Sequence, residues 1–133
     1  MPVDNQPTQL ETPPRRLRPE RVLLLSCDHA FRVVISLLLS RRGCSATATA
    51  SAGRLVELAG RERPDVVVVD VGGSAAAFRR AAGMIEALPR SVGVVVVADE
   101  PFAGPAEVPV LARWAPFAEL FAAIQLVGRR RGR

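Results

Sequence analysis

The sequence predicts an α/β fold in which helices cover both faces of a parallel β-sheet. Residues 66–69 are four consecutive valines, and a short β-branched run of this kind is typical of a strand buried on both faces. Comparable apolar runs occupy residues 22–25 and 92–97. Between these runs the apolar residues recur at helical spacing, and an alternation of strands with helices favours a parallel sheet.

The first half of the chain contains two predicted strand–helix units. A strand at 22–25 precedes a helix that carries Phe31, Val34, Ile35, Leu38 and Leu39 and ends at Arg41-Arg42-Gly43. Residues 44–50 alternate small and β-branched side chains, as a short edge strand does. Leu55, Val56, Leu58 and Ala59 form the apolar face of the next helix, which Arg63-Pro64 ends.

The second half continues the alternation. The strand 66–70 is followed by a helix that Ser74 or a neighbour caps and Pro89 ends, and a fourth strand covers 92–97. Gly93 in that strand indicates a close approach or a bulge. A short fifth strand, 108–112, contains Pro109, and Pro116 begins a last helix that carries Phe117, Leu120, Phe121, Ile124 and Val127.

Five strands and four clear helices predict a flavodoxin-like, doubly wound sheet. The stretch 98–107 contains Pro101, Gly104 and Pro105 and shows little periodicity. We therefore expect the helix between the fourth and fifth strands to be shortened or missing.

Composition predicts one domain with two polar ends. The chain has 133 residues, of which 49% are hydrophobic, enough for a single core. Five prolines among polar residues predict a disordered arm over 1–20, the domain covers 21–128, and 129–133 form an Arg-rich tail. The net charge of +5 lies mostly in that tail, because residues 22–128 contain ten arginines and ten acids. We therefore favour a solvated terminus over a nucleic-acid-binding segment.

The sequence argues against a metal centre, a disulfide framework and a membrane-spanning segment. Cys27 and Cys44 form no CxxC pair, and only His29 lies near them in sequence, so a metal centre and a disulfide framework are not expected. No apolar stretch is long enough to cross a bilayer, and the amino terminus is unlike a leader, so we expect a cytoplasmic location. All 18 basic residues are arginines, so no lysine chemistry is available.

Asp70 is the main candidate functional residue. It ends the valine run, and the Val71-Gly72-Gly73-Ser74 segment that follows is typical of a loop. Parallel sheets place their chemistry at the carboxyl ends of the strands, where Asp70 would meet a ligand, a metal ion or a phosphoryl group. No base, nucleophile and oxyanion-binding group can be combined around it, so we predict that the protein is not an enzyme. We expect His29 at the surface and Cys27 to be a buried, inert thiol.

Four segments carry a resemblance to a known family. They are residues 21–32 for the first strand and helix start, 63–70 (Arg-Pro-Asp, four valines and Asp) for the third strand, 94–98 for the fourth, and Ala115-Pro116-Phe117 after the fifth. The Arg-Pro-Asp-apolar-Asp block is the most specific, and the order and spacing of the four strengthen it. Over Arg21 to about Val127, the chain resembles the receiver domain of bacterial two-component response regulators.

The resemblance implies a phosphorylation site that is degenerate here. In that family, the aspartate matching Asp70 accepts a phosphoryl group from a histidine kinase, and it binds Mg²⁺ together with an acidic pair. That pair aligns with Ser26 and Cys27, which are not the hard anionic ligands that Mg²⁺ prefers. If a metal binds at all, its carboxylate ligands would be Asp28 and Asp70.

The family's phosphate-sensing groups are also missing. Its Ser or Thr aligns with Val97 and its lysine with Ala115, so neither a hydroxyl nor an ammonium group would contact phosphate. Arg113 lies two residues before the lysine position, and we expect it to lie too far down the strand to substitute. The family's switch aromatic aligns near Ala112, and we expect Trp114 to be a packing residue.

The preferred interpretation is a stand-alone pseudo-receiver that binds another signalling protein, a histidine kinase or another regulator, without depending on phosphorylation. Self-association as a homodimer is left open. One alternative is a phosphorylatable receiver in which Asp28 and Asp70 hold Mg²⁺. A second is binding of nucleic acid or an acidic partner through the Arg-rich tail.

Overall fold

A parallel sheet of five strands forms the centre of the computed structural model, which describes residues 20–100, 102 and 108–131, without the side chains of Ala75, Arg130 and Arg131. The strand order is β2-β1-β3-β4-β5, and every neighbouring pair is parallel. The strands are β1 (Arg21–Leu25), β2 (Ser45–Thr49), β3 (Val66–Gly72), β4 (Gly93–Ala98) and β5 (Val110–Ala112). This order confirms the flavodoxin-like, doubly wound prediction.

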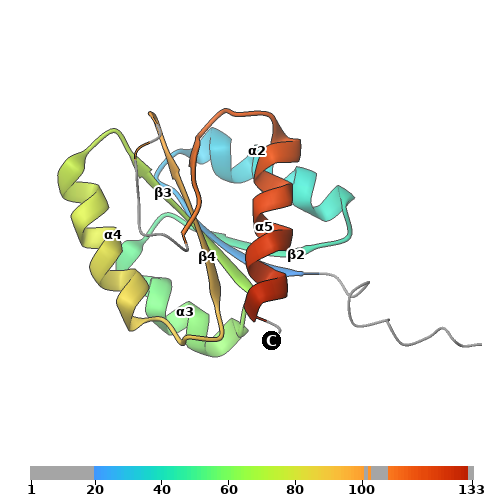
Figure 1. The fold of residues 1–133 in the computed structure, drawn as a ribbon, viewed down its shortest axis with the longest axis horizontal. Helices are drawn as coiled ribbons and strands as arrows, with labels where there is room; N and C mark the ends of the chain where they lie inside the picture. The colour runs from blue at the N-terminus through green and yellow to red at the C-terminus, as the bar shows by residue number, and fades with distance from the viewer. Residues whose placement is uncertain (1–19, 101, 103–107, 132–133) are drawn as a thin grey trace, which may run out of the picture.

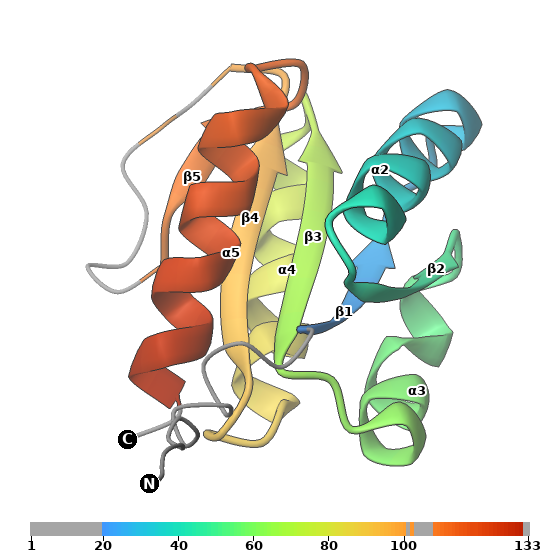
Figure 2. The same ribbon diagram turned by 90° about the vertical axis from the view of Figure 1, so that its right-hand side faces the viewer.

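Helices cover both faces of the sheet (Figures 1 and 2). One face carries α2 (His29–Arg41) and α5 (Phe117–Arg131). The other carries α3 (Leu55–Glu62), which the short 3-10 helix η3 (Ala52–Arg54) precedes, and α4 (Ala75–Ala87). None of the described helices is long and apolar enough to cross a membrane.

The valine run explains how one strand serves two cores. Val66 and Val68 pack with α2 and α5, whereas Val67 and Val69 pack on the opposite face with α3 and α4. All four are at most 1% exposed. Because alternate side chains of a strand point to opposite faces, a central strand must be apolar at every position, as this one is.

Side-chain caps and a glycine set the helix ends; the Ser74 cap and the end at Gly43 are predicted by the sequence, and the Asp28 cap is an addition from the structure. Asp28 caps α2 by accepting a hydrogen bond from Phe31 N at 3.1 Å, and Ser74 caps α4 by accepting one from Ala77 N at 3.1 Å. After α2 the chain turns through Gly43, whose φ of +84° is in the left-handed region.

Three predicted segments lie wholly or partly outside the described residues: the Arg-rich tail, the stretch between β4 and β5, and the amino-terminal arm. The proposed Arg-rich tail is partly helical, because α5 continues to Arg131. Arginine is a good helix former, and its charge is favourable at a helix carboxyl end. The expected loss of a helix between β4 and β5 falls mainly on 101 and 103–107, and the arm on 1–19, which are outside the described residues.

Gly93 marks a close approach between β4 and α5. A Cβ added there would lie 2.8 Å from Val127 Cγ2 and 2.9 Å from Val127 O, so the strand and the helix backbone meet at this residue. The sequence prediction of a close approach is confirmed.

We expect Gly93→Ala to lower the free energy of unfolding by about 1–3 kcal/mol, the usual cost of overpacking. The matched control is Gly83→Ala in α4, where an added Cβ meets nothing within 4 Å, and which should stabilise the helix by about 0.5–1 kcal/mol. Urea unfolding of both variants checks the prediction, and equal effects of the two substitutions would contradict it.

Candidate functional site

Asp70 lies at the carboxyl edge of the sheet, where its backbone leaves β3. The pairing of β3 with β4 shifts between Asp70 and Gly72, and Gly72 has a φ of +65°. In this bulge, Gly72 N donates a hydrogen bond to Asp70 Oδ1 at 3.0 Å. The Asp70 side chain is only 3% exposed. Gly72, the last residue of β3, therefore makes the turn and also orients the carboxylate.

Ser26 supplies the second hydrogen bond to Asp70. It follows β1, is fully buried, and donates from Oγ to Asp70 Oδ2 at 2.6 Å. The same hydroxyl accepts a hydrogen bond from Asp28 N at 3.0 Å, and the Ser26 carbonyl accepts one from Arg32 Nη1 at 2.8 Å. Ser26 thus joins the β1 end to the β3 end through a neutral group.

Arg113 places a guanidinium among the carboxylates of this edge. Nη1 lies 2.8 Å from Asp28 Oδ2 and 3.6 Å from Asp70 Oδ2, while Nη2 binds Asp99 Oδ1. The backbone N of Arg113 donates to Ala98 O at 2.8 Å, which fixes the turn after β5 to the end of β4. One cation therefore connects the carboxyl ends of four strands, β1, β3, β4 and β5.

The expectation that Arg113 lies too far down the strand is wrong. β5 ends at Ala112, so Arg113 is the first residue beyond the carboxyl end and faces the same edge as Asp70.

The charges in the site stabilise one another. The pKa of Asp28 is held below its ordinary value, first by the hydrogen bond from Phe31 N and further by the charge of Arg113, against the opposing effect of desolvation. Desolvation would lower the pKa of Arg113, but the hydrogen bond to Asp99 and the charges of Asp70, Asp99 and Asp28 raise it. An arginine guanidinium is charged throughout the ordinary pH range of proteins, and these contacts favour the charged form of Arg113 further.

The residues around Asp70 do not fit the Mg²⁺ site that the receiver resemblance implies. Ser26 is neutral and donates its proton to Asp70, and Asp28 is engaged in the α2 cap and the Arg113 ion pair. Within the described ranges, no three His, Cys, Asp or Glu side chains are grouped so that they could hold a metal ion. The cationic charge at the site comes instead from Arg113.

The remaining predicted positions lie around this cluster without adding chemistry. Val97 pairs with Asp70 in the sheet and is buried in the core beneath α2 and α5. The backbone N of Ala115 donates a hydrogen bond to Ala112 O at 3.1 Å in the turn after β5.

Cys27 is exposed, so the expectation of a buried thiol is wrong. It lies in the loop between β1 and α2, where its side chain points away from the core. His29 is exposed, as predicted.

Trp114 is more exposed than a packing residue should be. Its ring meets Phe31 edge to face, with the centroids 5.3 Å apart, but 59% of the residue is exposed. The turn that points Arg113 inward points Trp114 outward.

Sequence reasoning missed Asp99, which completes the cluster. Asp99 follows the apolar run of β4 just as Asp70 ends that of β3, and this parallel is the signal that could have found it. Its backbone N donates to Gly72 O at 3.0 Å. A Cβ on Gly73 would lie 2.8 Å from Asp99 Oδ2, so the small residue leaves space for the carboxylate.

Comparisons with known proteins agree with this architecture. No protein-family model and no curated protein sequence matches the chain. Its fold is similar to that of the amino-terminal domain of a response regulator/sensory box/GGDEF protein from Carboxydothermus hydrogenoformans (TM-score 0.68, 15% identity, covering 85% of this chain and 97% of that one). It is also similar to a response regulator receiver domain protein from Bacillus halodurans (TM-score 0.66, 16% identity, covering 81% and 96%).

A third similar structure holds a modified aspartate. It is a response regulator from Burkholderia pseudomallei with a phosphorylated aspartic acid, a calcium ion and citrate (TM-score 0.62, 19% identity, covering 84% of this chain and 69% of that one). These likenesses show that the chain has the fold of response regulator receiver domains. In the present chain, the Arg113 guanidinium lies beside Asp70.

The depressed pKa of Asp28 predicts an acid-dependent stability. Because the folded-state pKa lies below the unfolded one, Asp28 stabilises the fold above about pH 4 and loses this contribution as the pH falls through the folded value. Asp28→Asn keeps a capping side chain but cannot titrate, so its unfolding free energy should fall less steeply below about pH 4.

Urea unfolding measured across this acid range checks the prediction. Glu57→Gln is the control, since Glu57 makes only an exposed contact, 3.8 Å from Arg54. If Asp28→Asn and Glu57→Gln change the acid dependence equally, the role given to Asp28 is wrong.

Proposed function

We propose that this chain is a non-enzymatic, cytoplasmic receiver-fold module of two-component-type signalling, which binds another signalling protein without phosphorylation of Asp70. The partner would be a histidine kinase or another regulator. The receiver-type fold supports the signalling role. The observation that carries the proposal is the ion pairing of Arg113 with Asp28, Asp70 and Asp99.

The limited space and the charge balance around Asp70 both oppose its phosphorylation. Both oxygens of Asp70 already accept hydrogen bonds, and its side chain is almost fully buried. A phosphoryl group would bring further anionic oxygens to a site whose cation is shared among three carboxylates, and a divalent ion would normally offset that charge. The Arg113 guanidinium cannot be deprotonated, and moving it away would leave the buried carboxylate of Asp70 uncompensated.

One observation favours the phosphorylatable alternative. Arg113 places a cation 3.6 Å from Asp70 Oδ2, and an arginine that swung outward could pair with phosphoryl oxygens. In that case Asp28 and Asp70 would have to bind Mg²⁺ after losing their present partner.

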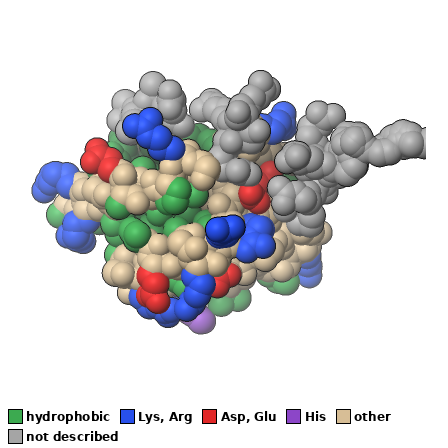
Figure 3. All heavy atoms as spheres, turned by 90° about the horizontal axis from the view of Figure 1, so that it is seen from below, with side chains coloured by type: hydrophobic (Ala, Val, Ile, Leu, Met, Phe, Trp, Pro, Cys, Tyr) green, Lys and Arg blue, Asp and Glu red, His purple; other side chains and the backbone are tan. Residues whose placement is uncertain are grey.

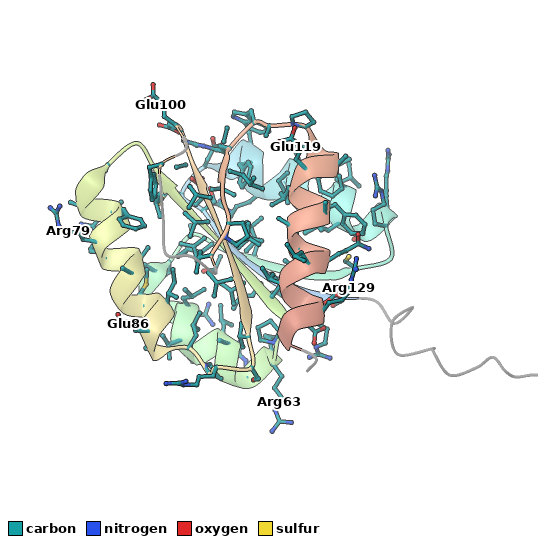
Figure 4. All side chains as sticks on the ribbon, viewed as in Figure 1. Arg63, Arg79, Glu86, Glu100, Glu119 and Arg129 are labelled. Carbon is teal, nitrogen blue, oxygen red and sulfur yellow. The ribbon has the colours of Figure 1, made fainter. Side chains whose placement is uncertain are left out.

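Arg129 lies near the carboxyl end of α5, whereas Arg113 lies in the turn that precedes the amino end of this helix. In Figure 4, Glu100 and Glu119 lie at the end of the molecule where β4 leaves the sheet, and Arg129 lies lower on α5, away from both. On the face shown in Figure 3, arginines lie in separate groups among acidic and hydrophobic side chains. Binding of nucleic acid or an acidic partner through the terminal arginines would therefore be a property independent of Asp70.

Incubation with acetyl phosphate and millimolar Mg²⁺ should leave the intact mass of the protein unchanged. Without a free carboxylate oxygen and a divalent ion, transfer to Asp70 has no stabilised transition state. A conventional receiver treated in parallel is the positive control. A mass increase of one phosphoryl group that Asp70→Asn abolishes would instead establish the phosphorylatable alternative.

Asp70→Asn should also retain signalling function in the cell. Asparagine keeps an oxygen for Ser26 or Gly72 and the shape of the side chain, while it cannot be phosphorylated. Complementation of a deletion strain by wild type and by Asp70→Asn, at matched soluble levels, measures this. Loss of function in a folded Asp70→Asn protein would contradict phosphorylation independence.

A further inference from the structure

Arg113 has one buried donor that the carboxylates of its cluster leave unused. Its Nη1 pairs with Asp28 and Asp70, and its Nη2 pairs with Asp99. The Nε atom is buried and has no hydrogen-bond partner among the residues that the structure describes. Buried N–H groups in native proteins nearly always have an acceptor, because leaving one unpaired costs free energy. An acceptor on a bound molecule would remove that cost.

A cavity borders this guanidinium between α2 and α5, which cover the same face of the sheet (Figure 2). Its volume is about 130 Å³. Besides Arg113, its walls are mainly aliphatic and aromatic side chains, among them Ile35 and Leu38 of α2, Val97 of β4, and Phe117 and Leu120 of α5. Ile35, Val97 and Leu120 are at most 5% exposed, so the cavity reaches into the core.

The size and polarity of the cavity favour a small organic molecule over water. Apolar cavities of about 150 Å³ accept a ring the size of benzene, whereas a buried water needs about three hydrogen bonds. Among the described lining residues, the side-chain donors are those of Arg113 and the Trp114 indole. Ala112 and Ala115 leave the space open near β5, since each contributes a single side-chain carbon. The space therefore suits an apolar ring or short chain with one polar atom.

The charges around Arg113 favour a neutral acceptor as that polar atom. One guanidinium already faces the three carboxylates Asp28, Asp70 and Asp99. An incoming carboxylate or phosphate would add to this negative excess where water is partly excluded. An ammonium group would bring a second cation and further donors to the guanidinium. A ketone, ester or amide carbonyl adds no charge and accepts the Nε hydrogen.

We propose that this cavity is a binding site for a small neutral carbonyl compound. Its ring or short chain lies among Ile35, Leu38 and Phe117, and its carbonyl oxygen accepts a hydrogen bond from Arg113 Nε. Sites of this kind are typically apolar, with a few polar groups that fix the orientation of the ligand. The inference goes beyond the proposed protein interaction and does not depend on it.

The Nε–H resonance of Arg113 in the ¹⁵N-labelled full-length protein reports the proposed hydrogen bond directly. It is assigned by its loss in Arg113→Lys. The probe is cyclohexanone, which should bind with a dissociation constant of about 1 mM or below and shift this resonance downfield in a saturable way. Methylenecyclohexane has the same shape without the acceptor and should cause no such shift. Cyclohexanecarboxylate carries a negative charge and should bind at least about tenfold more weakly.

Matched substitutions locate the site. Ala115→Leu fills the cavity and should weaken cyclohexanone binding by about tenfold or more, whereas Ala76→Leu should leave it unchanged. Ala76 is exposed on α4, which covers the other face of the sheet. Leu38→Ala enlarges the cavity and should raise the affinity for the larger ring of cycloheptanone roughly tenfold. Circular dichroism checks that each variant is folded.

Several results would overturn the proposal. These are an Arg113 Nε–H resonance that cyclohexanone does not move, an equal shift with methylenecyclohexane, or equal affinity for the carboxylate. Equal binding by Ala115→Leu and Ala76→Leu, with no gain for cycloheptanone in Leu38→Ala, would place any binding elsewhere. A cross-peak from Nε–H to bound water that persists at saturating cyclohexanone would assign the acceptor to water only. None of these results alters the mass test at Asp70, so failure here is distinguishable from failure of the proposed function.

Discussion

The ion pairing of Arg113 with Asp28, Asp70 and Asp99 is the interaction on which the carboxyl edge of the sheet depends. Parallel strands bring their carboxyl ends together, and in this chain three of the converging segments end in carboxylates. Like charges at such distances repel strongly where water is partly excluded. A single guanidinium has enough donors to satisfy several carboxylates at once, and its charge cannot be removed by deprotonation.

This arrangement changes what Asp70 does. A carboxylate that accepts from Ser26 and Gly72 and faces a fixed cation is a structural element that joins β1, β3 and the turn after β5. In a site that works through Mg²⁺, the cation can arrive and leave, and the charge can change. Under the proposed function, a covalently attached cation would keep one state, and the surface beside it, including Trp114, would keep one arrangement.

The sequence predicts the parts of this structure that local patterns determine. The valine run, the Ser74 cap and the tight contact at Gly93 follow from residue types and spacing alone. The site is different, because Arg113 and Asp70 are far apart in the chain and their contact depends on where β5 ends. In the family alignment, the lysine position falls on Ala115, two residues beyond Arg113. Asp99 was accessible to sequence reasoning, since it follows β4 as Asp70 ends the apolar run of β3, whereas the exposure of Cys27 depends on the path of one loop.

A double-mutant cycle between Arg113 and Asp70 tests the central claim most directly. The unfolding free energies of wild type, Arg113→Gln, Asp70→Asn and the double variant are measured by urea denaturation. If the guanidinium compensates the buried carboxylate, Arg113→Gln alone should cost about 3 kcal/mol or more, and much of that cost should vanish when Asp70 is already Asn. The account predicts a coupling free energy of about 1–3 kcal/mol. Additive effects, within about 0.5 kcal/mol, would show that Arg113 does not serve as the cation of this site.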